Sequence, residues 1–177
     1  MLETQRLILR ELTEADAEFI LAQLNDLAFI RNVTDRGVRT LAAARAYILA
    51  GPIASYRIHG FGLYLVELKS SRTPIGICGL VKRDTLDDVD IGFAFLPPYR
   101  SRGFALEAAT ATMAFARTLG LSRIVAVVSS HNAASIKLLG RLGFVYERQV
   151  RLADDAEELQ LFASAPAASE ARDRDTH

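Results

Sequence analysis

The stretch of residues 89–129 constrains the fold most strongly, because it has the pattern of a strand, a helix and a second strand. Residues 89–96 alternate bulky apolar side chains with small or acidic ones, which is typical of a β-strand. The alanine-rich residues 102–119 carry apolar side chains at helical spacing and end before Gly120. The β-branched residues 124–128 predict a buried strand. Two strands joined by a helix of this length predict a parallel pair with a right-handed crossover, and hence an α/β fold.

A cationic loop joins the first of these strands to the helix. It reads Tyr99-Arg100-Ser101-Arg102-Gly103-Phe104-Ala105 and follows Pro97-Pro98. The first N–H groups of a helix have no partner inside it and carry partial positive charge, so they bind anions. Arg100 and Arg102 oppose the helix dipole, a conflict that a bound phosphate relieves. The alternative interpretation is that they are ordinary cations on an exposed first turn.

Composition excludes several other classes of protein. The 177 residues fit one domain, and 21 basic residues balance 21 acidic ones, so no overall basic field indicates nucleic acid. The single cysteine, Cys78, excludes an internal disulfide framework and favours a reducing compartment. No signal-peptide pattern and no apolar run of membrane-spanning length are found. We therefore expect a cytoplasmic protein without a membrane partner, as a monomer or homodimer.

The remaining segments predict one domain over residues 1–163. We expect strands over residues 6–12, 61–69, 74–83, 145–152 and 158–163. Helices should start after the caps Thr13, Thr40 and Asn132, with the second running toward Gly51-Pro52 and a polar loop over residues 32–37. Residues 164–177 lack periodicity and predict a disordered tail.

Several segments resemble one known family. Arg100-Ser101-Arg102-Gly103-Phe104-Ala105 resembles the Gln/Arg-x-x-Gly-x-Gly/Ala loop of the GNAT superfamily of N-acetyltransferases. Residues 132–144 are similar to its Asn-x-x-Ser-x-x-hydrophobic-x-x-x-x-Gly-Phe segment, with Asn132 and Ser135 in place. Residues 3–10, 90–93 and 103–108 are similar to the branch of ribosomal-protein N-terminal acetyltransferases. The resemblance covers about residues 3–162 in one consistent order.

The resemblance implies a single-domain GNAT fold of α/β (α+β) class, with a splayed mixed sheet of about seven strands flanked by about four helices. It implies that acetyl-CoA binds as co-substrate between the strand ending at Leu96 and the strand ending near Ser129. No metal is implied. The implied cofactor-binding residues are Phe93, Ala94, Phe95 and Leu96 for pantetheine, Arg100, Ser101, Arg102, Gly103, Phe104 and Ala105 for pyrophosphate, and Asn132 and Ser135 for the pantetheine arm or thioester.

The family reaction is direct attack by a neutral amine on the thioester, which calls for a base, a polarised carbonyl and protonation of the leaving thiolate. Asp90 is the first candidate base, followed by Glu67 and Asp88, although for each of them alone a solvated turn or strand carboxylate is the commoner case. Many family members place a tyrosine acid where this chain has Leu139. Ser135 is therefore our candidate for helping the thiolate leave.

The acceptor stays open between a protein N-terminal α-amine and a small-molecule amine. An α-amine, with a pKa of about 8, is partly neutral near pH 7, whereas a lysine, at about 10.4, depends on a base. The acidic residues Asp84, Asp87, Asp88 and Asp90 either attract a cationic amine or simply solubilise a turn. Likewise the helices before residue 60 either form the lip of a substrate pocket or only pack.

Other chemistries match less well. The cationic loop lacks the Gly-Lys-Ser/Thr of a nucleotide P-loop and has one glycine, Gly103, where a dinucleotide fingerprint has three. A lone mid-strand cysteine is usually inert packing, and no Cys/His cluster has metal-ligand spacing. The second class of function is a non-catalytic acyl-CoA-binding or interaction module of the same fold, which the missing tyrosine favours.

Overall fold

The computed structural model describes residues 1–165. Of the predicted tail, residues 166–177 lie outside the described part. The domain boundary predicted at residue 163 falls one residue short, because Ser164 belongs to the last strand. Its side-chain oxygen accepts a hydrogen bond from the Ile124 N–H at 3.0 Å, which ties it to a neighbouring strand.

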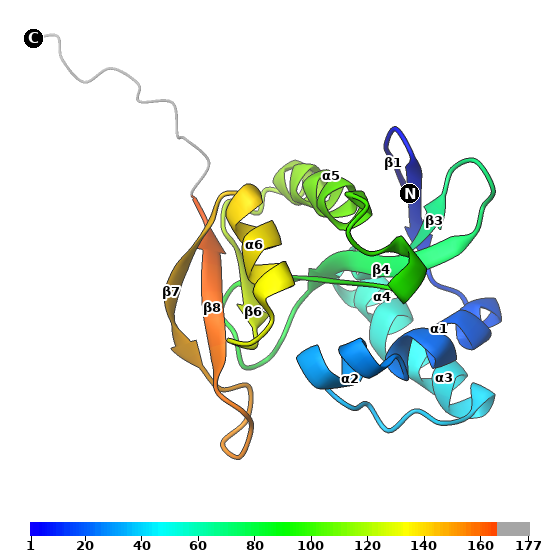
Figure 1. The fold of residues 1–177 in the computed structure, drawn as a ribbon, viewed down its shortest axis with the longest axis horizontal. Helices are drawn as coiled ribbons and strands as arrows, with labels where there is room; N and C mark the ends of the chain where they lie inside the picture. Colours follow the sequence, from blue (N-terminus) through cyan, green and yellow to red (C-terminus); the bar gives the residue numbers. More distant parts are fainter. Residues whose placement is uncertain (166–177) are drawn as a thin grey trace, which may run out of the picture.

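The described chain forms one mixed sheet of eight strands in the order β1-β2-β3-β4-β5-β6-β8-β7 (Figure 1). The extra strand, relative to the seven predicted, is the two-residue β1, which pairs with β2. The strands are β1 (Leu2–Glu3), β2 (Leu7–Glu11), β3 (Leu63–Leu68), β4 (Pro74–Val81), β5 (Val89–Phe95), β6 (Ile124–Val128), β7 (Phe144–Val150) and β8 (Leu159–Ser164). All neighbours are antiparallel except β5 and β6, which form the predicted parallel pair.

Helices cover both faces of the sheet. The helical elements are η1 (Glu14–Asp16), α1 (Ala17–Leu24), α2 (Leu27–Asn32), α3 (Leu41–Ile48), η2 (Leu49–Ile53), α4 (Ala54–His59), η3 (Pro97–Tyr99), α5 (Phe104–Thr118) and α6 (Ala133–Arg141). One apolar core joins α5 and Leu139 of α6 to the sheet, and a second joins α1, α2 and α3 to Leu65 and Ile77. In β3, alternate residues serve the two cores, with Tyr64 and Val66 in the first and Leu65 in the second, as the period-two pattern predicts. No helix in residues 1–165 is long and apolar enough to cross a membrane.

The parallel strands β5 and β6 part almost as soon as they meet. Only Val89–Ile124 and Asp90–Val125 are paired, although β5 continues to Phe95 and β6 to Val128. This confirms the splay that the family resemblance implies. The carboxyl ends of two parallel strands therefore lie on either side of a gap, which is where open α/β sheets place ligands.

Two helical segments differ from the prediction. The polar stretch that we expected to be a loop from residue 32 follows a short helix, α2, which Asp26 caps by accepting a hydrogen bond from the Phe29 N–H at 3.0 Å. The helix after Thr40 does not stop at Pro52. A π-helical turn, η2, absorbs this proline, and the chain stays helical to Gly60. A wider turn tolerates the missing N–H that would end a regular α-helix.

The opening strand is fixed to α5 by one carboxylate. Glu107 accepts hydrogen bonds from the Thr4 hydroxyl at 2.6 Å, the Arg6 N–H at 2.8 Å and the Arg6 Nε at 2.7 Å. Burial alone would raise the pKa of Glu107, but these hydrogen bonds and the Arg6 charge together lower it. The start of the chain thus holds the first turns of α5, and with them the cationic loop, against the sheet.

Candidate active site

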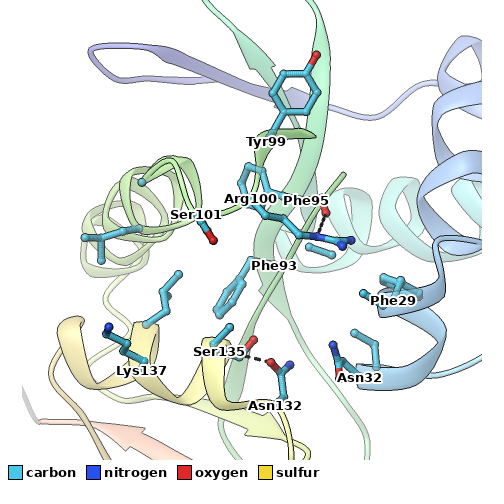
Figure 2. Close-up of a pocket in the computed structure, with 18 of the residues that line it drawn as sticks. Phe29, Asn32, Phe93, Phe95, Tyr99, Arg100, Ser101, Asn132, Ser135 and Lys137 are labelled. Atoms are coloured by element: carbon cyan, nitrogen blue, oxygen red, sulfur yellow. Dashed lines mark hydrogen bonds between the residues drawn. The ribbon is translucent and has the colours of Figure 1, made fainter. Parts of the chain in front are cut away.

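A cavity of about 480 Å³ lies in the gap between the parted strands. Its walls come from β5, the loop before α5, α6 and α2. Figure 2 shows Phe93 near its centre, with Asn132 and Ser135 of α6 on one side and Phe29 and Asn32 of α2 on another. The structure therefore brings together segments that lie far apart in the sequence.

The cationic loop presents unpaired backbone N–H groups to this cavity. Within the described residues, the N–H groups of residues 101–105 have no hydrogen-bond partner, whereas the Arg100 N–H donates to the Pro97 carbonyl at 3.3 Å. Ser101, with a φ of 57°, and Gly103, with a φ of 80°, both take the left-handed conformation. Such alternation of backbone conformation forms an anion-binding concavity, here at the start of the fifteen-residue helix α5. The unusual conformation of a non-glycine residue, Ser101, is typical of a functional loop.

The edge of β5 that faces the gap offers further main-chain groups. The Leu96 N–H donates to the Ile75 carbonyl of β4 at 2.9 Å. Because strand residues alternate in direction, the main-chain groups of Phe95 and Phe93 point to the opposite edge, where β6 has moved away. The Phe95 carbonyl accepts a hydrogen bond from the Arg100 Nε at 2.8 Å (Figure 2).

The cavity is cationic. Arg100, Lys137 and Arg141 line it, and among residues 1–165 no lining side chain is a carboxylate or an imidazole. Within residues 1–165, no three His, Cys, Asp or Glu side chains come together to hold a metal ion. Unpaired N–H groups and an excess of cations fit the pyrophosphate of coenzyme A. The residues present therefore suit an acetyl-CoA co-substrate.

The start of α6 is built as the sequence predicts. Asn132 caps the helix, because its Oδ1 accepts a hydrogen bond from the Ser135 N–H at 3.2 Å (Figure 2). This capping bond turns the first residues of α6 toward the cavity, and both side chains line it. Leu139, at the position where many relatives have a tyrosine, is buried in the core beside the sheet. It has no polar atom with which to serve the reaction.

Most of the residues expected to bind the cofactor line the cavity, and three do not. Those that line it are Phe93, Ala94, Phe95, Arg100, Ser101, Gly103, Ala105, Asn132 and Ser135. Leu96 continues β5 toward β4 and lies outside the lining. Phe104 is buried in the core, and the exposed Arg102 lies over its ring, 5.3 Å from the centroid. The side chains of Phe104 and Arg102 thus pack against each other, outside the cavity lining.

Asp90 lies at the closed end of the gap, outside the cavity. It is buried, 1% exposed, and forms an ion pair with the Arg83 Nε at 2.5 Å. Burial raises the pKa of Asp90 to about 6, although the charge and hydrogen bond of Arg83 act in the opposite direction. Asp90 pairs with Val125 at the last point where β5 and β6 touch. The structure places it outside the cavity lining, at the point where the strands part.

Glu67 also lies outside the cavity. Its carboxylate accepts a hydrogen bond from the Arg10 Nε at 2.7 Å, and the Arg72 Nε lies 3.0 Å away. Arg10 in turn forms an ion pair with Asp16 at 2.8 Å. Glu67 thus belongs to a network that joins β2 and β3 to the start of α1. Asp88, the third candidate, forms an ion pair with Arg123 at 2.9 Å, and it too lies outside the lining.

Sequence reasoning left open whether the early helices form the lip of a pocket, as α1 does, and it missed α2. Gln23, Ala28, Phe29, Asn32 and Val33 line the cavity from these helices. An ion pair between Arg100 and Asp26 joins the cationic loop to the cap of α2, and the His131 Nε2 lies 3.2 Å from the Arg31 carbonyl. The helix α2 therefore bridges the loops that follow both parted strands. The cap signal at Asp26 was the one feature that could have revealed it.

Fold and cavity together define an acyl-CoA-dependent transferase. The family model described as acetyltransferase (GNAT) domain matches residues 6–145. An uncharacterized N-acetyltransferase of Bacillus subtilis, YoaA, is 32% identical over 154 residues, which cover 85% of this chain and 86% of that protein. The chain therefore belongs to the GNAT family of N-acetyltransferases.

Solved structures agree with this assignment. The crystal structure of an acetyltransferase from Agrobacterium tumefaciens is 25% identical and superposes with a TM-score of 0.78, covering 93% of each chain. A ribosomal L7/L12 α-N-protein acetyltransferase in complex with coenzyme A, RimL, is 17% identical and has a TM-score of 0.80, covering 94% of this chain and 97% of that one. At this identity the second structure shows a shared fold.

Gly103→Ala should weaken coenzyme A binding about 5- to 10-fold, because a side chain opposes the positive φ that shapes the row of N–H groups. Gly120→Ala is a matched control, since Gly120 has a φ of 76° just beyond the other end of α5. Calorimetric titration with coenzyme A, alongside thermal unfolding, measures both effects. Equal affinities in the two variants would contradict the assignment of the loop.

Asp90→Asn should change how stability depends on pH. The native carboxyl, with a pKa of about 6, holds its proton more tightly than the unfolded one, at about 3.9, so this group lowers the free energy of unfolding as the pH rises from about 4 to about 6. As the pH rises from 4 to 7, the free energy of unfolding of the variant should therefore increase relative to that of the wild type by about 1–3 kcal/mol. Urea unfolding measures this, with the exposed Asp87→Asn as control. Parallel pH curves for wild type and Asp90→Asn would contradict it.

Proposed function

We propose that this enzyme transfers the acetyl group of acetyl-CoA to an α-amine, such as a protein N-terminus, by direct attack. The observation that carries the proposal is the composition of the cavity. It has unpaired N–H groups and the cations Lys137 and Arg141 for the donor, and none of the lining residues in the described part of the chain is a carboxylate or histidine that could remove a proton from the acceptor.

A cavity without a base favours an acceptor that is already neutral. An amine attacks a thioester only after it has lost its proton. Near pH 7 about a tenth of an α-amine, with a pKa of about 8, is neutral, whereas a lysine side chain, with a pKa of about 10.4, is neutral in roughly one molecule in a few thousand. Water suffices to take the proton from the first kind of amine.

Each wall of the cavity has a part in this proposal. The N–H groups of residues 101–105, with Lys137 and Arg141 nearby, hold the pyrophosphate end of the donor. The free edge of β5 at Phe93 pairs with the pantetheine amides as an added strand would. Ser135 donates a hydrogen bond to the leaving sulfur. A thiol with a pKa of about 8.5 leaves tolerably near neutral pH, so this help accelerates the reaction without being indispensable.

The similarity to RimL supports the same acceptor class. That protein is described as an α-N-protein acetyltransferase, and its fold and this one superpose over nearly their whole lengths. The opening residues 3–10 of this chain also resemble the branch of ribosomal-protein acetyltransferases. We extend the acceptor class to this chain on these two grounds and on the chemistry of the cavity.

The pH dependence of turnover tests the proposal. With an excess of acetyl-CoA, kcat/KM for a peptide α-amine should rise until the pKa of that amine, about 8, and at pH 7 should exceed that for a lysine side chain on the order of 10²-fold. Thiol release, corrected for hydrolysis without acceptor, gives both values. A shared rise governed by one enzyme group below pH 7 would show that a base operates. Coenzyme A binding with no turnover of any amine in a broad panel would instead favour a non-catalytic module.

Ser135→Ala should lower kcat about 10-fold while leaving the affinity for coenzyme A within about two-fold, since only a hydrogen bond to the leaving sulfur is removed. Ser130→Ala, in the exposed loop before α6, is the control. Single-turnover thiol release reports the chemical step. An unchanged rate would exclude Ser135 as the group that assists departure of the thiolate.

A further inference from the structure

The side chain of Gln23 is a buried amide that has no partner. Gln23 is 0% exposed, and neither its Nε2 nor its Oε1 makes a hydrogen bond within the described residues. Buried polar groups in native proteins are nearly always hydrogen-bonded, because an unpaired one keeps the full cost of leaving water. An amide with both ends unpaired therefore calls for an explanation.

The position of Gln23 explains its unpaired amide, because the residue lines the cavity. It lies in the last turn of α1, three residues before Asp26, which caps α2 and is paired with Arg100. It thus borders the cavity from the side of α1 and α2, whereas the residues proposed to hold the donor come from the cationic loop and α6. This is the side that remains for the acceptor.

The helix α2 can admit a ligand to this amide. It has six residues, and two polar contacts tie it to the loops after β5 and β6, from Asp26 to Arg100 and from the Arg31 carbonyl to His131. Leu27 at its start is 83% exposed. The buried residue of α2 is Phe29, which packs in the second core. A small shift of α2 that leaves Phe29 in place would open the cavity wall at Gln23.

A primary amide selects its ligand by chemistry. It offers N–H donors on one atom and an acceptor on the other. A peptide group offers the complementary pair, a carbonyl and an N–H, and an N-terminal residue carries both next to its α-amine. A protonated polyamine offers donors only, and would leave the Gln23 Nε2 unpaired.

We infer that Gln23 is an acceptor-binding residue, whose amide pairs with the peptide group that adjoins the reacting α-amine and so sets specificity for peptides over simple amines. This inference rests on the proposed function and names a residue that performs its acceptor selection. If Gln23 only filled space, an apolar side chain of similar length would serve every ligand equally well.

The test compares two ligands in Gln23→Met. Calorimetry measures the Kd of an unblocked Ser- or Ala-initiated tetrapeptide, and of butylamine, for the protein saturated with coenzyme A, so that no turnover is needed. Relative to wild type, we expect the tetrapeptide Kd to rise about 10-fold and the butylamine Kd to stay within about two-fold, with an unchanged or higher Tm and an unchanged coenzyme A Kd. Gln160→Met, in β8 and outside the cavity lining, is the matched control.

Three results would overturn the inference: an unchanged tetrapeptide Kd in Gln23→Met, an equal loss for both ligands, or no binding of the tetrapeptide to the wild type. A result that separates the two proposals is also available. Gln23-dependent binding of the tetrapeptide without thiol release from acetyl-CoA in the wild type would support the role of Gln23 and refute the proposed catalysis.

Discussion

The pairing of β5 with β6 over only two residues each is the constraint on which the rest of the structure depends. If β5 and β6 were hydrogen-bonded along their whole lengths, the sheet would have no room for a ligand between them. The strands separate after Asp90, whose side chain is buried and paired with Arg83 at that point. An ionised pair of this kind is costly to bury but far more costly to break, so it favours a defined geometry over raw stability. The gap it borders exposes the edge of β5 and receives the start of α5.

Arg100 connects the two sides of this gap. Its Nε donates to the Phe95 carbonyl at 2.8 Å, and its guanidinium also pairs with Asp26 at the cap of α2. One side chain thus contacts the strand edge expected to meet pantetheine and the helix that covers the acceptor side. A donor molecule that competes for either contact would change how firmly α2 is held. Arg100 therefore ties the position of α2 to the edge of β5.

The parts that could be predicted from the sequence are those set by local chemistry. Strand alternation in residues 89–95, the caps at Thr40 and Asn132, and Gly120 beyond α5 each specify structure within a few residues, and all are confirmed. The cavity lining from the cationic loop and α6 follows from the same segments. The helix α2 was missed because a segment of six residues is too short to show an apolar period. The end of the helix after Thr40 was predicted too early, because a proline such as Pro52 ends a regular α-helix but is accommodated here in a π-helical turn.

The candidate bases lie outside the cavity lining for a different reason. A carboxylate on the right strand is recognisable in a sequence, but its partners are not. Asp90 and Glu67 face arginines that come from a loop and from a strand 57 residues away, so their charges are used within the fold. Conversely, no sequence pattern identifies Gln23, because its distinguishing feature is a side-chain amide without a hydrogen-bond partner in the folded chain. Such an unpaired group can be recognised only in the folded structure. The donor site, made of backbone and local turns, can therefore be predicted from a single sequence, while the acceptor site depends on tertiary contacts.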